Sequence, residues 1–116
     1  EVFMPLVQKV SYGGFYKAEL EYLHLPSLSS TYHCSLSCNF FVSTNLSSLK
    51  TLNEQFCFTY CQNLRLFIAL KLKNISKYCF SNCPQLKTVL TPNATISEYA
   101  IKNCPELKTI LALEGD

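Results

Sequence analysis

Apolar residues and cysteines return at a long, regular interval through the second half of the chain. Residues 78–90 (YCFSNCPQLKTVL) align with residues 99–111 (YAIKNCPELKTIL) at an offset of 21, and residues 56–68 (FCFTYCQNLRLFI) precede the first of these by 22. An interval of this length is typical of a repeat architecture. Four columns recur in the aligned copies: Phe58, Phe80 and Ile101; Cys61, Cys83 and Cys104; Leu64, Leu86 and Leu107; Phe67, Val89 and Ile110.

The repeat extends towards the N-terminus with lower similarity. If Cys34 and Cys38 are aligned with Cys57 and Cys61, Phe41 falls in the Leu64 column. The same alignment puts Ser35 and Thr44 where apolar residues are expected, so the second turn is expected to be distorted. A competing alignment matches residues 47–52 (SSLKTL) to residues 84–89 (PQLKTV), but it leaves too few residues for a full turn before Leu64. We therefore prefer the alignment on cysteines. Turns then start at Leu20, Phe41, Leu64, Leu86 and Leu107.

A unit of this size is too small to enclose a core, so the units must stack and bury their apolar columns against one another. The segment from each leucine predicts a short strand, and the CF-x-x-C segment predicts a crossing or short helical turn on the other side. Asn63, Asn82 and Asn103 recur just before the strands, where a turn is expected. The sequence predicts a solenoid with a cap or partial repeat in residues 1–13, the array in 14–113 and a tail in 114–116.

The motif in residues 80–92 (FSNCPQLKTVLTP), with its aligned copies, resembles the BspA-like (Treponema-type) leucine-rich repeat. The resemblance covers about residues 14–113 and implies an α/β, right-handed leucine-rich-repeat solenoid of about five turns, with short parallel strands on its concave face. It also implies a non-catalytic surface or secreted protein that adheres to host matrix or cells through a protein ligand.

The composition excludes several other classes of protein and of binding partner. The 116 residues are 48% hydrophobic and 16% charged, which fits one folded domain and excludes a disordered chain. No apolar run approaches the ~20 residues that cross a bilayer. A net charge of +2 is too weak to indicate nucleic acid or anionic lipid. Gly13 and Gly14 lack the rest of a phosphate-loop motif, so no cofactor is expected.

Strand residues between the buried columns should face outward and form the candidate binding surface. The outward columns place a basic stripe beside an aliphatic one, which would suit an acidic or mixed protein surface. Alternatively, the lysines and threonines only solvate the sheet, and the aliphatic residues turn inward. Glu21, Tyr22 and His24 in the first turn, and Val42, Ser43 and Asn45 in the second, make the face non-uniform. The candidate partner-binding residues are Arg65, Lys87, Lys108, Thr88, Thr109, Ile68, Leu90 and Leu111.

The seven cysteines allow three interpretations. They can be buried thiols acting as small hydrophobic groups, disulfides between neighbouring turns, or zinc ligands with C-x-x-x-C spacing. Ala100 replaces the first cysteine of the last pair, which favours a small apolar position and argues against a metal. An odd cysteine count leaves at least one thiol free. Reduced buried cysteines would favour an intracellular scaffold or regulatory module over a surface adhesin, and a zinc-stabilised structural domain is the third possibility.

No catalytic residue is expected. His33 and Cys34 are adjacent, so in a strand their side chains point to opposite faces, and no third group is positioned to orient them.

Two further features concern glycosylation and the end of the solenoid. The sequons at Asn45, Asn74 and Asn93 are possible glycosylation sites, and a glycan on Asn45 would cover part of the candidate face. Residues 111–113 are apolar and only three residues follow them, so either the parent protein continues or the solenoid self-associates through its ends.

Overall fold

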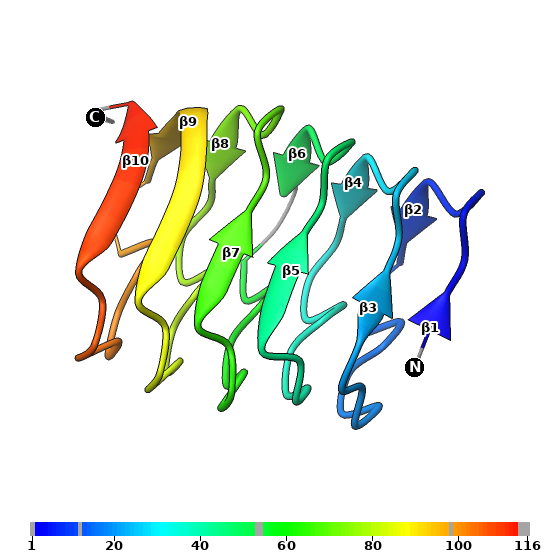
Figure 1. Ribbon diagram of the computed structural model, residues 1–116, viewed down its shortest axis with the longest axis horizontal. Helices are drawn as coiled ribbons and strands as arrows, with labels where there is room; N and C mark the ends of the chain where they lie inside the picture. Colours follow the sequence, from blue (N-terminus) through cyan, green and yellow to red (C-terminus); the bar gives the residue numbers. More distant parts are fainter. Residues whose placement is uncertain (1, 12, 53–54, 98, 114–116) are drawn as a thin grey trace.

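In the computed structural model, which describes residues 2–11, 13–52, 55–97 and 99–113, the chain winds into a solenoid with two rows of strands (Figure 1). The row that faces the viewer, here called the front sheet, contains β1 (Val2–Phe3), β3 (Leu23–His24), β5 (Ser43–Asn45), β7 (Leu66–Ile68), β9 (Thr88–Ile96) and β10 (Thr109–Leu113). The row behind it, the back sheet, contains β2 (Lys9–Val10), β4 (Ser30–Thr31), β6 (Thr51–Leu52) and β8 (Asn74–Ile75).

All strand pairs are parallel, as expected when successive turns stack. In the front sheet, Ser43, Leu66, Thr88 and Thr109 lie in register on β5, β7, β9 and β10. The end of β9 pairs instead with β8, so this strand belongs to both rows. Residues 2–10, which the sequence indicates as a cap or partial repeat, contribute β1 and β2, which pair with β3 and β4. The structure confirms the predicted solenoid of about five turns with parallel strands.

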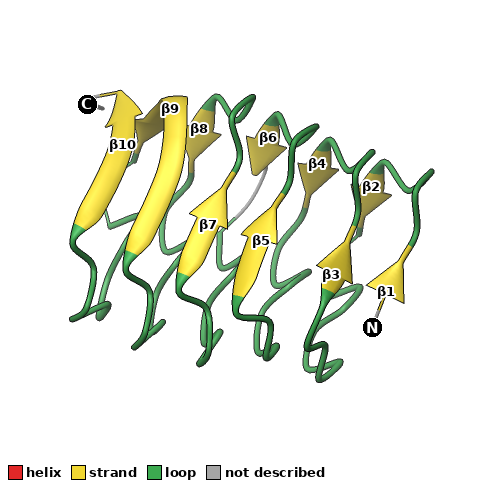
Figure 2. Ribbon diagram, viewed as in Figure 1, coloured by secondary structure: helices red, strands yellow, loops and turns green. Residues whose placement is uncertain are grey.

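The described residues contain no helix, and so none with the length and apolar character needed to cross a bilayer (Figure 2). The connection from the back sheet to the front sheet, here called the loop edge, consists of turns. In each of the last four turns this edge carries two residues of positive φ spaced four apart, such as Tyr78 (56°) and Asn82 (58°). A left-handed residue interrupts a right-handed helix, so the expected short helical turns are loops instead.

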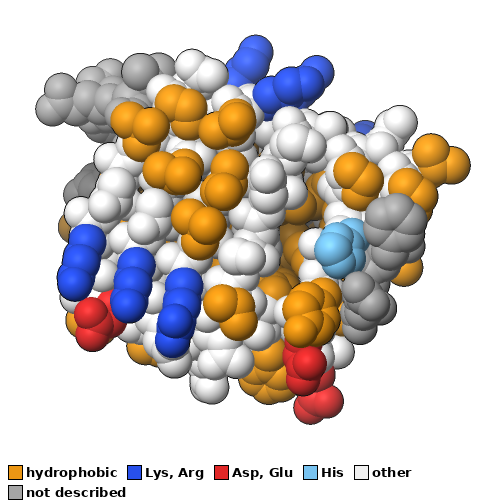
Figure 3. Space-filling model, in the orientation of Figure 1, with side chains coloured by type: hydrophobic (Ala, Val, Ile, Leu, Met, Phe, Trp, Pro, Cys, Tyr) orange, Lys and Arg blue, Asp and Glu red, His pale blue; other side chains and the backbone are white. Residues whose placement is uncertain are grey.

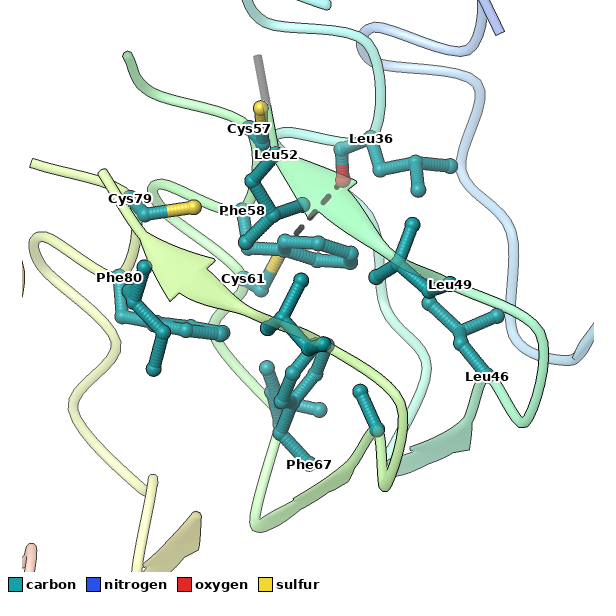
Figure 4. Close-up of a cluster of buried hydrophobic side chains, with 14 of the residues drawn as sticks. Leu36, Leu46, Leu49, Leu52, Cys57, Phe58, Cys61, Phe67, Cys79 and Phe80 are labelled. Atoms are coloured by element: carbon teal, nitrogen blue, oxygen red, sulfur yellow. Dashed lines mark hydrogen bonds between the residues drawn. The ribbon is translucent and has the colours of Figure 1, made fainter. Parts of the chain in front are cut away.

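The core lies between the two sheets and is held by contacts between adjacent turns. Phe58, Phe67 and Phe80 are fully buried, and their ring centroids lie 5.1 Å (Phe58 to Phe67), 4.7 Å (Phe67 to Phe80) and 5.5 Å (Phe58 to Phe80) apart (Figure 4). Leu64 and Leu86 are buried beside them. Each such side chain contributes about 1.5–3 kcal/mol through burial. In the last turn, which has no further turn stacked on it here, Ile101 and Leu107 are half-buried and Ile110 is 44% exposed.

The alignment of Cys34 and Cys38 with Cys57 and Cys61 is wrong by one residue. The N–H of Leu36 donates to Cys57 O, as the N–H of Phe58 donates to Cys79 O, so Leu36 occupies the position of Phe58. The physical reason for this register is burial. It places the large apolar side chain of Leu36 in the core, where it is fully buried.

The corrected register changes the roles of the surrounding residues. Cys34 and Cys38 occupy positive-φ positions on the loop edge, and Ser35 takes the small buried position of Cys57. Because Phe41 still aligns with Leu64, the second turn is one residue shorter between Asn39 and Phe41.

Asn39 replaces a cysteine at the corner of this shorter turn. Its Nδ2 donates to Phe15 O (2.9 Å) in the preceding turn and to Ser37 O (3.2 Å) in its own. Its Oδ1 accepts a hydrogen bond of 2.9 Å from the Leu20 N–H. Cys61 makes the matching pair of contacts, to Leu36 O (3.5 Å) and Thr59 O (3.8 Å) (Figure 4). The repeat position that Asn39 and Cys61 share therefore requires a side chain that is small and can donate a hydrogen bond.

The same contacts continue as a thiol ladder formed by Cys61, Cys83 and Cys104. Cys83 Sγ donates to Phe58 O (3.1 Å) and Cys104 Sγ donates to Phe80 O (2.7 Å), each in the preceding turn. The hydrogen bond with Cys104 lowers the pKa of Cys83, but the hydrogen bond with Cys61 and burial raise it more, to about 12. The hydrogen bond with Cys83, followed by burial, raises the pKa of Cys104. Cys83 and Cys104 are therefore protonated at neutral pH.

Among the described residues, the buried hydroxyl groups of Ser35 and Thr44 lack a hydrogen-bond partner. Thr44 aligns with Phe67 in the front sheet and is 3% exposed, so a hydroxyl group occupies a core position. Burying an unsatisfied polar group costs about 1–3 kcal/mol. The second turn is therefore a weak point of the stack.

Thr44→Val tests this weakness. Valine keeps the shape of threonine and removes the unpaired hydroxyl, so we expect the free energy of unfolding to rise by about 1 kcal/mol in urea denaturation. Thr31→Val is the matched control, because the buried Thr31 Oγ1 contacts Cys57 Sγ at 3.3 Å and its removal should give no gain. Equal effects of the two substitutions on the free energy of unfolding would contradict the view that the unpaired Thr44 hydroxyl is destabilising.

The raised pKa of Cys83 predicts a loss of stability in alkali. Between the ordinary thiol pKa of 9.0 and about 12, the folded state keeps the Cys83 proton while the unfolded state releases it, so stability falls as pH rises through this window. Under reducing conditions, urea midpoints should fall more steeply from pH 8 to pH 11 in the wild type than in Cys83→Ser, which keeps a donor that does not ionise. Parallel pH profiles of the wild type and Cys83→Ser would contradict the raised pKa of Cys83 in the thiol ladder.

Candidate protein-binding face

The candidate basic residues align on three neighbouring turns of the front sheet. The N–H of Lys87 donates to Arg65 O (2.9 Å), and the N–H of Lys108 donates to Lys87 O (3.0 Å). All three side chains are exposed, because each follows a leucine whose side chain points into the stack. Figure 3 shows them as a row over the lower ends of β7, β9 and β10. We call this row the basic stripe, and its neighbouring turns are ~4.8 Å apart.

The positive charges of the basic stripe have no carboxylate partner among the described residues. Within residues 2–11, 13–52, 55–97 and 99–113, no carboxylate forms an ion pair with Arg65, Lys87 or Lys108. Arg65 Nε donates to the neutral amide of Gln85, with 3.3 Å between Nε and Oε1. Cations on neighbouring turns repel one another, and water and salt screen this repulsion. An anionic surface placed against the stripe would relieve this repulsion.

An aliphatic column runs beside the stripe on the same strands. Ile68, Leu90 and Leu111 are in register; the first two are half-buried and Leu111 is 53% exposed. The neighbouring Leu70 is 52% exposed. Figure 3 shows a group of hydrophobic side chains above the basic stripe. The three side chains of the column are therefore not fully turned into the core.

A third column separates the two and is mixed in character. It contains Leu66 and Thr88, both half-buried, and Thr109, which is exposed. Its position places hydroxyl groups between the charges and the aliphatic side chains on β9 and β10. The three columns together, eight candidate residues and Leu66, define the front face.

The front face changes character towards the N-terminus. Tyr22 is 59% exposed and Val42 is 51% exposed, and no basic side chain takes the equivalent place there. His24 on β3 and Asn45 on β5 are exposed in the column of Ile68. The candidate surface is therefore confined to β7, β9 and β10.

The three sequon asparagines lie on different sides of the solenoid. Asn45 is exposed on β5 next to the front face, and Asn74 is half-buried on β8 in the back sheet. Asn93 is exposed, and its Nδ2 donates to Leu70 O at 3.1 Å. A glycan on Asn45 would therefore adjoin the aliphatic column.

The seven cysteines are free thiols in this structure. Cys57, Cys79, Cys61 and Cys83 are buried, and Ala100 is buried in the same small position as Cys79. Across the described part of the chain, no group of three or more His, Cys, Asp or Glu side chains is arranged to hold a metal ion.

An aromatic ladder on the loop edge was not predicted. The ring centroids of Phe56 and Tyr78 are 5.4 Å apart and those of Tyr78 and Tyr99 are 5.9 Å apart, with nearly parallel planes. His33 meets Phe56 edge-on at 5.4 Å, and Lys102 Nζ lies 5.8 Å from the Tyr99 centroid. The sequence signal was the aromatic residue that opens each aligned segment, at positions 56, 78 and 99.

Comparison with known protein families matches residues 2–108 to the BspA-type leucine-rich-repeat region, in 6 copies. No curated protein and no solved structure gives a significant match. The match covers most of the chain and begins within β1, so it includes the N-terminal segment. With the parallel-strand solenoid and its recurring leucine columns, it shows that this chain belongs to the BspA-type leucine-rich-repeat family.

Proposed function

We propose that the repeat array is a non-catalytic module that binds another protein through the front face. The observation that carries this proposal is the basic stripe, three exposed cations in register without ion pairs among the described residues, next to a partly exposed aliphatic column. Leucine-rich repeats are associated with protein interactions, which agrees with the family match.

The chemistry of the front face defines the partner. Aliphatic side chains give the apolar centre that protein interfaces need, and the charges at one side form a polar rim. A rim of one sign accelerates association with a surface of the opposite sign and rejects basic surfaces. The partner should therefore present carboxylates beside a small apolar patch.

We further propose that the biological role is adhesion by a surface or secreted protein, with a host or matrix protein as the ligand. This role follows from the resemblance to BspA-like proteins. The exposed, uniformly basic row on three turns supports it as a surface suited to an acidic macromolecule.

Charge reversal tests the front face. The variant Arg65→Glu, Lys87→Glu, Lys108→Glu should bind purified matrix proteins or host cells at least about tenfold more weakly than the wild type, because the cationic rim becomes anionic. Surface plasmon resonance at two salt concentrations measures the loss and its electrostatic origin.

The matched control reverses three exposed lysines outside the front face, Lys50→Glu, Lys71→Glu and Lys73→Glu, and so changes the net charge equally. We expect this control to retain most of the binding. Full binding by the front-face variant, or equal loss in both variants, would overturn the proposal.

A second candidate is an intracellular scaffold that uses the same face. The observation that favours it is the thiol ladder, whose hydrogen bonds to backbone carbonyls need reduced cysteines. Alkylation of the protein from its native source under denaturing, non-reducing conditions separates the two roles. Seven alkylated cysteines in the intact mass favour the scaffold, whereas fewer indicate bridges and an oxidising compartment.

A further inference from the structure

Three adjoining cavities form a continuous groove that runs along the loop edge and reaches the front sheet at Val42 and Ser43. Their volumes are about 480, 480 and 390 Å³. The first and second share Phe40, the first and third share Tyr60 and Gln62, and the second and third share Asn63. We call the groove that they form the loop groove; it crosses the turns from Tyr22 to Asn103.

The short second turn shapes the loop groove. The missing residue between Asn39 and Phe41 brings Phe40 to this edge, where it is 37% exposed. Tyr60, Asn82 and Asn103 occupy equivalent positive-φ positions (55°, 58° and 59°) on successive turns. Asparagine tolerates this conformation, but for a bulky residue such as tyrosine it is strained. The fold therefore holds an aromatic side chain at this edge at a cost in backbone energy.

Aromatic side chains line one half of the groove. Tyr16 is 46% exposed and Tyr60 is 55% exposed, and both share the first cavity with Phe40. Apolar rings that gather around a cavity while open to solvent mark a binding site more often than isolated exposed rings do. This half offers stacking surface to a ligand.

Side-chain amides line the other half. Gln62, Asn63, Asn82, Gln85 and Asn103 surround the third cavity. Asn63 Nδ2 donates to Phe40 O (3.4 Å), and Asn103 Nδ2 donates to Asn82 Oδ1 (3.0 Å). Each amide has two donor hydrogens and an acceptor oxygen, so these contacts leave further donors and acceptors for a ligand.

Charged side chains do not line the amide half, where Arg65 only donates a hydrogen bond to Gln85, and charges are nearly balanced in the aromatic half. The residues around the third cavity are all uncharged. Lys17 and Glu19 both line the first cavity, and Glu21 lines the second. The groove therefore suits a neutral ligand that both donates and accepts hydrogen bonds.

We propose that the loop groove binds a neutral oligosaccharide that lies across the turns, with sugar rings against Tyr16, Phe40 and Tyr60 and hydroxyl groups on the amides. The C–H groups of a sugar ring complement the negative face of an aromatic ring. Sugar hydroxyls donate and accept, as the amides do. This site shares no lining residue with the front face, although Gln85 accepts a hydrogen bond from Arg65, and it would be a second binding activity.

A peptide fits the groove less well. A strand-like peptide binds through backbone N–H and C=O groups, but those at this edge pair with the next turn, as in Tyr60 N–H to Ser81 O (3.0 Å) and Asn82 N–H to Lys102 O (2.8 Å). A proline-rich peptide would match the aromatic half. It lacks N–H donors, however, so it would leave the amide oxygens of the other half without partners.

Calorimetric titration with cellohexaose, xylohexaose, maltohexaose and mannohexaose tests the proposal. We expect at least one to bind with Kd below about 1 mM and Tyr60→Ala to weaken that binding about tenfold or more. Gln62→Ala should also weaken it. Tyr99→Ala is the matched control, because Tyr99 is 52% exposed but lies outside the groove; it should leave Kd unchanged. Circular dichroism verifies that each variant is folded.

The remaining outcomes decide against the proposal. It is overturned if none of the four sugars binds, if Tyr99→Ala weakens binding as much as Tyr60→Ala, or if a proline-rich decapeptide binds at Tyr60 and no sugar displaces it. The variant Lys87→Glu, Lys108→Glu should keep its sugar binding, because neither lysine lines the groove. Sugar binding therefore tests the loop groove independently of protein binding at the front face.

Discussion

The structure depends on contact between neighbouring turns, because no single turn of 21–23 residues can enclose a core. Phe67, for example, packs against both Phe58 and Phe80, which occupy equivalent positions on neighbouring turns. The backbone obeys the same constraint, since every strand pairs with an equivalent strand one turn away. Stability is therefore distributed along the stack, and each turn owes its shape to its neighbours.

This constraint explains why the columns differ in what they accept. A core column accepts Phe, Leu or Ile, which fill similar space. The thiol-ladder column accepts Cys61 or Asn39, because each fits the corner and donates to a carbonyl of the preceding turn. The column of Cys57 and Cys79 accepts Ser35 or Ala100, so only size limits it. Cysteine thus serves two different structural purposes within one repeat.

A stacked architecture also places equal side chains side by side on the surface. The same repetition that aligns leucines inside aligns Arg65, Lys87 and Lys108 outside, so a modest net charge becomes a concentrated stripe. The loop groove arises in the opposite way, from a local irregularity in the second turn. The two candidate surfaces thus have different origins, and they share no lining residue.

The sequence by itself determined the solenoid, its period and the alignment of Arg65, Lys87 and Lys108 on neighbouring turns, because stacking forces equivalent residues into equivalent places. It could not determine the register of the second turn. Cys34 and Cys38 matched the later cysteines by identity, but burial of Leu36 outweighed that match. Only the tertiary structure decided that the loop edge has no helix, that the cysteines act as donors, and that Phe40 and Tyr60 meet at one groove. Each of these depends on contacts between turns that one-dimensional spacing does not contain.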